Sequence, residues 1–365
     1  NSVWCGTFQL IWNDLKNDIA KQDIIFTPQL QIAEKLNKGT FTTNDISEES
    51  YYKVYGTPTI ELKKKIGNAI KDKFNETSDI LDNFEWNGSE TNGNNYFLYS
   101  MLKKEFEFEK KFTELESGKF GEYNGVEYFG ICEDTEYEVR NQVKVLYYNS
   151  KENFAIKLLT KQNDEVIIVK GAKENNFYDI YQNVMKQKEE YKGEIYFNEK
   201  DKLKIPNIQF KIKEEFEELE GQEFKLWNEE SYQITNALQT IEFELDKAGG
   251  KVKSEAGLGL TNSCIDLTKE PREFIVDDSF TIFLQEREKS LPYLAARVDD
   301  ISKFQINNEE LKKDETAEKS DKLVAMYKTI IDHLVENNNA TYPTDKYISL
   351  LQKYSYDTLP PPMLS

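Results

Sequence analysis

The sequence predicts a mixed α/β domain, in which strands and amphipathic helices share one chain. Residues Tyr232–Leu245 end in strict alternation of apolar and acidic side chains, the pattern of a half-buried strand. Two apolar runs at 274–286 and 291–304, separated by the charged stretch 287–290, predict a β-hairpin. Residues Pro58–Phe74 repeat apolar side chains at helical spacing behind an initial proline, which predicts an amphipathic helix.

The other elements follow from the same two periodicities. The stretch Val3–Ile24 carries apolar residues at helical spacing and is expected to form a helix that packs on the core. The polar stretch Phe41–Tyr55 contains a capping aspartate and predicts one short helix. Further along we expect strands over Val126–Cys132, Glu138–Tyr148, Phe154–Leu159 and Glu165–Lys170, then a helix over Asn176–Tyr191, while Asn87–Asn95 has the composition of a loop.

Composition and charge argue against several classes of partner. The 365 residues carry a net charge of −19, which disfavours nucleic acid and anionic lipid because both need a basic surface. No stretch approaches the ~20 apolar residues of a membrane-spanning helix. Three cysteines are too few for a disulfide framework. The chain starts at Asn1 rather than Met, so an upstream secretion signal could have been removed; the compartment stays open, with secretion slightly favoured.

The sequence offers little catalytic chemistry. Its single histidine, His333, would have to serve any serine or cysteine triad, and a histidine on a helix surface or interface is the simpler interpretation. No glycine motif for phosphate or dinucleotide binding occurs, and no cysteine or histidine spacing supports zinc. The acidic pairs at 277–278 and 299–300 are commoner as solvated turns than as a metal or acid–base pair. We therefore expect no enzyme, no cofactor and no metal site.

A long segment between two strong strands is the feature around which the chain is organised. Residues Asp246–Glu273 are rich in Gly, Ala, Ser and Thr and contain one proline. A loop of this length is uncommon in a compact domain and is usually functional or disordered. Its part from Ser254 to Thr261 has small residues and no proline, so it could also form a strand.

Several patches, in the right order, resemble the serpin family. The segment after the strand Tyr232–Leu245 is similar to the serpin hinge. Phe280–Leu284 and Leu294–Val298 are similar to the two terminal core strands, the second of which reads F-M-G-R-V in the family. The other patches are Thr27–Pro28 after the first helix, Tyr96–Phe112, Arg140–Tyr147, and, within Lys202–Phe224, Ile205–Pro206, Phe210–Ile212 and Leu219–Phe224 with a shortened helix between them. The resemblance covers roughly residues 5 to 304.

The resemblance implies a large mixed β-sheet with a helical layer and a second sheet that holds the terminal hairpin. In serpins a protease cleaves the exposed loop, and the hinge side of the loop then inserts as a new strand into the main sheet. The resemblance places the hinge at Gly249, Gly250, Lys251, Lys253, Ser254, Glu255, Ala256 and Gly257. It places the reactive loop at Thr261, Cys264, Asp266, Leu267, Thr268, Lys269 and Arg272, with the scissile bond near 266–269 and Leu267 or Lys269 as the first-site residue. The implied partner is a serine or cysteine protease.

The hinge departs from the family's pattern, and the departures leave two functions open. Lys251 stands where serpins carry a glutamate and Lys253 where they carry a glycine, and burying an unpaired lysine in a sheet is costly. Leu258 and Leu260 replace small residues, and Phe108 replaces a tryptophan. The first hypothesis is a protease-binding protein that inhibits by loop insertion or is only a substrate. The alternative is a non-inhibitory serpin-like fold that serves as a structural or partner-binding module.

Some sixty residues follow the usual end of the family's sequence. We expect residues 1–304 to form the serpin-like domain and 305–365 to form a helical extension. The extension's longer helix is expected over Thr316–Asn337, with apolar positions Leu323, Met326, Tyr327, Ile330, Ile331 and Leu334, and a shorter one over Thr344–Tyr354. Because the chain before Tyr96 is shorter than in serpins, we expect the extension to occupy the helical layer left vacant there, where it could also bind another protein.

Overall fold

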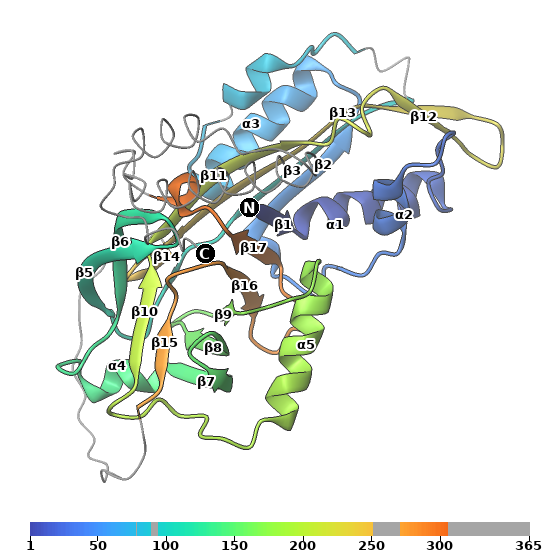
Figure 1. Ribbon diagram of the computed structural model, residues 1–365. Helices are drawn as coiled ribbons and strands as arrows, with labels where there is room; N and C mark the ends of the chain where they lie inside the picture. Colours follow the sequence, from blue (N-terminus) through green and yellow to red (C-terminus); the bar gives the residue numbers. More distant parts are fainter. Residues whose placement is uncertain (78, 89–93, 251–270, 306–365) are drawn as a thin grey trace, which may run out of the picture.

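The computed structural model describes residues 1–77, 79–88, 94–250 and 271–305. These residues form strands in four sheets, with helices on the outer faces (Figure 1). The predicted mixed α/β fold is confirmed, because parallel and antiparallel strand pairs occur in the same sheet and helices cover its faces. No helix within the described ranges is long and apolar enough to cross a membrane.

The large mixed sheet has the strand order β11-β13-β3-β2, with β12 paired to the far part of β13. Its long central strand is the predicted one, extended by one residue at its start. Strands β13 and β3 run parallel and pair at nine positions, whereas β11, β12 and β2 pair antiparallel with their neighbours. The bounds are β11 Ile208–Glu215, β13 Ser231–Leu245, β3 Asn95–Lys103, β2 Tyr51–Gly56 and β12 Gln222–Lys225.

A second sheet of six antiparallel strands has the order β1-β17-β16-β9-β8-β7. It contains the predicted hairpin, whose strands β16 and β17 pair from Phe280 with Val298 to Leu284 with Leu294. The second sheet therefore holds the terminal hairpin, as the resemblance implied. The bounds are β1 Ser2–Cys5, β17 Leu294–Val298, β16 Phe280–Glu286, β9 Asp164–Lys170, β8 Asn153–Leu159 and β7 Val143–Ser150.

Two smaller sheets contain the described residues next to the two ends of the segment 251–270. The four-stranded sheet has the order β15-β10-β6-β5, and β15 and β10 run parallel. The two-stranded sheet pairs β14 with β4. The bounds are β15 Glu273–Ile275, β10 Lys202–Pro206, β6 Tyr123–Ile131, β5 Thr113–Phe120, β14 Gly249–Gly250 and β4 Phe106–Glu107.

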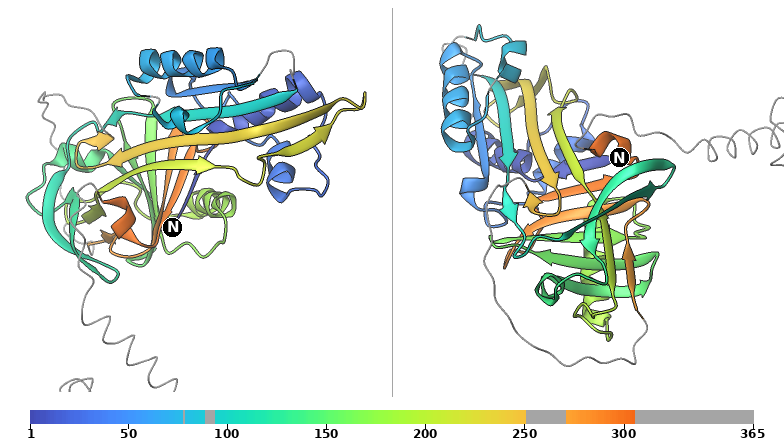
Figure 2. Two further views of the ribbon diagram at one scale, coloured as in Figure 1. Left: turned by 90° about the horizontal axis from the view of Figure 1, so that it is seen from above. Right: turned by 90° about the vertical axis from the view of Figure 1, so that its left-hand side faces the viewer.

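Helices cover both faces of the large mixed sheet. On one face α3 (Ile60–Phe74) buries Ile66 and Ile70 against Phe97 of β3, as its apolar periodicity predicted, and Figure 2 shows this helix lying along the sheet. The side-chain oxygen of Thr59 caps α3 by accepting a hydrogen bond from the Leu62 amide at 3.2 Å. The remaining helices are α1 Thr7–Asp14, α2 Gln31–Asn37, α4 Tyr137–Asn141, α5 Phe177–Glu190, the π-helical turn Leu15–Ala20 and the 3₁₀ turns η2 Glu48–Ser50, η3 Asp79–Asn83 and η5 Ile301–Phe304.

The main core lies between the large mixed sheet and the six-stranded sheet. Alternate residues of β13, among them Ile241 and Phe243, are buried in the same cluster as Ile282 of β16. A second cluster joins α1 and α2 to the far half of the large sheet. Removing this much apolar surface from water is the main force that holds the two sheets together.

Three expectations about local structure were wrong. The stretch Val3–Ile24 is not one helix, because Ser2–Cys5 pairs with β17 as an edge strand and the helix starts only at Thr7. Residues 138–141, expected at the start of the strand Glu138–Tyr148, belong to the short helix α4 (Tyr137–Asn141). The shortened helix expected within Lys202–Phe224 is a turn at 217–220. In the first case long-range strand pairing outweighed the local apolar pattern.

Candidate functional site

The site is built from the described residues at the two ends of the segment 251–270, which we call the near anchor (residues 246–250) and the far anchor (Arg272 with Asp201). At the near anchor the chain reverses directly after β13. The amide of Asp246 donates to the carbonyl of Gly249 at 2.9 Å, and the amide of Ala248 donates to the Asp246 carboxylate at 2.7 Å. An aspartate that bonds to the backbone two residues on and a glycine at positive φ are the residue types that such a turn requires.

The near anchor is fastened to the segment that follows β3. Gly249 pairs with Glu107 in β4, and the amide of Phe108 donates to the carbonyl of Ala248 at 2.9 Å. Both glycines of β14 are buried, and Gly249 has a φ of +131°. A Cβ at Gly249 would lie 2.4 Å from the carbonyl oxygen of Phe106, so only glycine allows this close approach.

The near anchor also lies at the end of the parallel seam between β13 and β3. Gly249 forms one bridge to Asp246, which follows β13, and another to Glu107, which follows β3 by only a few residues. Gly249 is therefore flanked by the continuations of both seam strands. A strand that continued from β14 into the seam would run antiparallel to both neighbours.

The far anchor is a buried ion pair. The Arg272 guanidinium donates to Asp201 Oδ2 at 2.6 Å, and the Arg272 amide donates to Asp201 Oδ1 at 2.9 Å. The Asp201 side chain is fully buried, and the Arg272 side chain is only 12% exposed. The carbonyls of Glu194 and Tyr196 accept two more hydrogen bonds from Arg272, at 2.5 and 2.6 Å. Such a multiply bonded arginine holds the start of β15 firmly against the segment before β10.

A fully buried arginine, Arg140, also holds the segment that carries Asp201 of the far anchor. Arg140 of α4 donates to the carbonyls of Cys132, Asn198 and Asp201 at 2.7, 3.1 and 2.9 Å. Burial lowers the pKa of Arg140, and the neighbouring Asp201 carboxylate works against that shift. The helical turn α4 places this guanidinium where it satisfies three backbone oxygens at once, which explains why the expected strand is interrupted there.

The structure describes three of the residues predicted for the hinge and reactive loop. Gly249 and Gly250 form β14, and Arg272 is partly buried at the far anchor, where it is paired with Asp201. The others lie outside the described residues: Lys251, Lys253, Ser254, Glu255, Ala256, Gly257, Thr261, Cys264, Asp266, Leu267, Thr268 and Lys269. The same holds for Leu258, Leu260, His333 and the helices expected over 316–337 and 344–354, so the division of the chain into a domain and an extension stays a prediction.

The acidic pairs do not converge on a common site. Asp277 accepts a hydrogen bond from Lys170 at 2.6 Å, and Asp299 lies 3.3 Å from the amino terminus. Asp300 caps η5 through the Ser302 amide. Among the described residues no group of three or more His, Cys, Asp and Glu side chains could hold a metal ion.

A buried charged cluster between the two main sheets was missed by the sequence reasoning. Lys104, just after β3, lies 2.7 Å from Glu286 Oε1 and 3.1 Å from Asp164 Oδ1. Glu286 also accepts hydrogen bonds from the amide and hydroxyl of Ser47, and Asp164 accepts one from the Tyr293 hydroxyl at 3.0 Å. Two carboxylates thus share one lysine in the interior, and the only sequence signal was a charge at the end of each apolar run.

Burial and hydrogen bonding move the two carboxylates of this cluster in opposite directions. Burial raises the pKa of Asp164, although Lys104 and Tyr293 oppose the shift. Burial would also raise the pKa of Glu286, but the hydrogen bonds from Lys104 and Ser47 together hold it below its usual value. Glu286 is therefore the carboxylate that the cluster stabilises most strongly in its charged form.

Comparison with known proteins shows a likeness of fold. No family model matches the sequence, and no curated protein matches it either. The chain is similar to the crystal structure of Serpin48, a highly specific serpin of the insect Tenebrio molitor, with 13% identity and a TM-score of 0.40 over 74% of this chain and 71% of that chain. It is also similar to thyroxine-binding globulin in complex with thyroxine, with 11% identity and a TM-score of 0.42 over 65% of this chain and 63% of that chain.

Proposed function

We propose that this chain binds a protease through the loop 251–270 and that cleavage lets the hinge side of the loop enter the seam between β13 and β3. One observation carries the proposal: Gly249, from which the hinge departs, bridges Asp246 on the side of β13 and Glu107 on the side of β3. The hinge would therefore need no new turn to enter the seam. An extended segment that adds to a sheet gains main-chain hydrogen bonds along its whole length.

The bridge between Asp246 and Gly249 also fixes the register that an inserted strand would have. Continued antiparallel pairing would set Lys251 opposite Glu244 and Lys253 opposite Glu242. Both glutamates are half-buried in β13. Opposite charges in directly facing positions contribute roughly 0.2–1 kcal/mol each. On the side of β3 the pairing of Gly249 with Glu107 would set Lys251 opposite Glu105 and Lys253 opposite Lys103, so Lys251 would face a carboxylate on both sides and Lys253 on the β13 side alone.

The opposite face of the inserted strand would be apolar. Val252 would lie opposite Phe243, and alternate residues beyond it are small or apolar: Ser254, Ala256, Leu258 and Leu260. The corresponding face of β13 carries Ile241 and Phe243 into the main core. Leu258 and Leu260, although larger than the residues that serpins use, would therefore lie on the core side of the sheet.

The far anchor restricts where a protease could act. Arg272 is held by Asp201 and two carbonyls, so its side chain is not free to enter a specificity pocket. Leu267 and Lys269 remain the proposed first-site residues, for a protease that prefers a large apolar or a basic side chain. The two anchors would hold the ends of the loop 251–270 while the protease binds its middle.

Limited proteolysis followed by thermal unfolding tests the proposal. A single cut between Thr261 and Arg272, mapped by mass spectrometry, is expected to raise the melting temperature strongly. In the variant Lys251→Glu the new carboxylate would face Glu244 and Glu105, so its melting temperature should rise less after the cut, whereas in Lys186→Glu, on the exposed side of α5, the rise should equal that of the wild type. A cut that leaves the melting temperature unchanged would refute insertion.

A non-inhibitory binding role is the second candidate. The observation that favours it is the closed seam, since β13 and β3 already pair at nine positions and an inserted strand must first separate them. In this case the cut chain should melt at the same temperature as the intact chain or lower. A partner would then be sought by pull-down with the full chain, and cleavage of the loop should not release it.

A further inference from the structure

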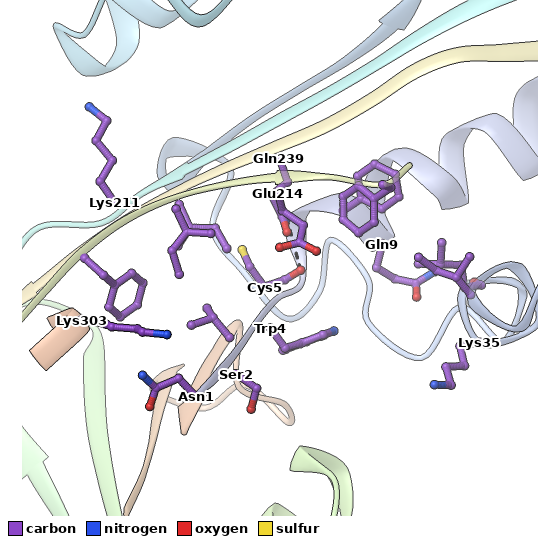
Figure 3. A pocket seen from close by; sticks show the side chains of 18 of the residues that line it. Asn1, Ser2, Trp4, Cys5, Gln9, Lys35, Lys211, Glu214, Gln239 and Lys303 are labelled. Atoms are coloured by element: carbon purple, nitrogen blue, oxygen red, sulfur yellow. Dashed lines mark hydrogen bonds between the residues drawn. The ribbon is translucent and has the colours of Figure 1, made fainter. Parts of the chain in front are cut away.

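A groove of about 730 Å³ lies along the edge strand β11 of the large mixed sheet (Figure 3). Side chains of β11 form one wall, and β1, α1 and α2 form the other. Six of its apolar lining residues are not fully buried: Val3, Trp4, Ile32, Leu36, Ile212 and Phe216. Trp4 is 37% exposed, although its neighbour Cys5 is buried. The groove therefore leaves apolar side chains in contact with solvent, beside the charged side chains of Lys35, Lys211, Glu214 and Lys303.

The exposed apolar side chains belong to two different core clusters. Val3 and Ile212 extend the cluster between the main sheets, whereas Ile32, Leu36 and Phe216 extend the cluster around α1. Both clusters end at the same groove. An apolar element placed there would join the two clusters into one core, which favours an occupant with a long apolar stripe over a compact ligand.

The described chain ends at the rim of this groove. Lys303 and Phe304 of η5 line it, and the side chain of Gln305 donates to the carbonyl of Asn207 at 2.6 Å. The amino terminus lies at the same place, because the side chain of Asn1 donates to the carbonyl of Asp300 at 2.8 Å. The following residues, 306–365, therefore start next to an apolar surface that nothing in the described part of the chain covers.

We propose that the segment Thr316–Asn337 of the same chain occupies the groove as an amphipathic helix. Its apolar stripe, Leu323, Met326, Tyr327, Ile330, Ile331 and Leu334, has the spacing of one helix face. The ten residues 306–315 can span roughly 33–36 Å when extended, which is ample for a groove that begins at η5. A short tether also gives a local concentration on the order of millimolar, which favours this segment over any free competitor.

A photo-cross-linking experiment on the full chain tests the contact without assuming a register. Benzoylphenylalanine replaces Trp4 in the groove or, as a control, Trp227, which is 80% exposed and does not line it. After irradiation, mass spectrometry of the monomer is expected to show a link from position 4 to a peptide within 316–337, and no such link from position 227.

Two matched variants then test the apolar stripe. Ile330→Asp places a charge on the stripe and should lower the cross-link yield about tenfold or more. Ala325→Asp adds the same charge on the opposite side of the predicted helix and should leave the yield unchanged. Ile330→Asp should also speed amide hydrogen exchange in residues 210–216.

Four results would overturn the proposal. They are a link to a different segment, a link that forms only between two copies of the chain, a small molecule retained in the groove on native mass spectrometry, and equal yields for the two aspartate variants. The proposal does not depend on the loop 251–270, so it stands or falls separately from the protease-binding function.

Discussion

Replacing Lys104 by methionine should destabilise the protein strongly, because this lysine neutralises two buried carboxylates. Its ammonium lies 2.7 Å from Glu286 and 3.1 Å from Asp164, whose side chains are 0% and 2% exposed. Removing one partner of a buried ion pair costs about 3–5 kcal/mol, since the other charge stays in the interior. At about 1–2 °C per kcal/mol for a chain of 365 residues, the melting temperature should fall by roughly 3 to 10 °C.

Two companion variants separate this effect from a general loss of packing. Glu286→Gln removes one negative charge and leaves Lys104 paired with Asp164, so we expect a smaller cost of about 1–3 kcal/mol from mismatched hydrogen bonds. Lys63→Met removes a lysine whose partner, Asp82, is 69% exposed, and should change the free energy of unfolding by no more than about 1 kcal/mol. Urea unfolding followed by tryptophan fluorescence measures all three values.

The free energy of unfolding that Lys104→Met loses relative to the wild type should become smaller as the pH falls. In the wild type the pKa of Glu286 is held below its usual value, so its contribution is present above the unfolded pKa and is lost as the pH falls through the folded pKa. Without Lys104 the pKa of both carboxylates in the folded state rises. As the pH falls, protonation therefore removes their unpaired negative charges and the variant regains stability. The difference between the two proteins should therefore shrink from pH 8 to pH 5. A difference below about 1 kcal/mol at pH 7.5, or one that does not change with pH, would refute the reasoning.

Three further outcomes test other parts of the structure. Arg272→Met leaves Asp201 buried without its cation and should cost about 3–5 kcal/mol in urea unfolding, whereas Arg272→Lys, which keeps the charge, should cost less. Gly249→Ala places a Cβ 2.4 Å from a backbone oxygen of β4, so its melting temperature should fall further than that of Gly125→Ala, where the added Cβ meets nothing within 4 Å. Burial raises the pKa of the Cys5 thiol to about 11, so at pH 8 this thiol should react with a maleimide only after unfolding, as mass spectrometry would show.

The elements that could be predicted from the sequence are those whose local pattern and long-range environment agree. The strand β13 alternates because one face meets the main core and the other meets half-exposed surface near its end. Helix α3 lies on the outside of the sheet, so its apolar stripe matches the single face that it buries. The hairpin of β16 and β17 was visible because its strands are close in sequence and separated by a charged turn.

The elements that could not be predicted depend on partners far away in the sequence. Val3–Cys5 reads as part of a helix, but its backbone completes the edge of the six-stranded sheet beside Leu294–Arg297. Lys104, Asp164 and Glu286 lie in three separate segments, and nothing in their local sequence shows that they meet. The burial of Arg272 is of the same kind, since its partner Asp201 precedes it by 71 residues. Single-sequence periodicity carries no information about such pairs.

The two strand pairings next to the hinge, β14 with β4 and β13 with β3, contribute differently to the barrier for the proposed insertion. The pairing of β14 with β4 is kept in the proposed insertion, because the inserted strand continues from Gly250, so this pairing adds little to the barrier. Separating β13 from β3 is a much larger step, because nine paired positions must part before new bonds replace them. The rate of insertion should therefore be governed by the parallel seam and little by the glycine anchor. A substitution that weakens the seam, such as Thr240→Ala, which removes the hydrogen-bond partner of the Tyr99 hydroxyl across β13 and β3, should speed the stability gain after cleavage, whereas weakening β14 should leave its rate nearly unchanged.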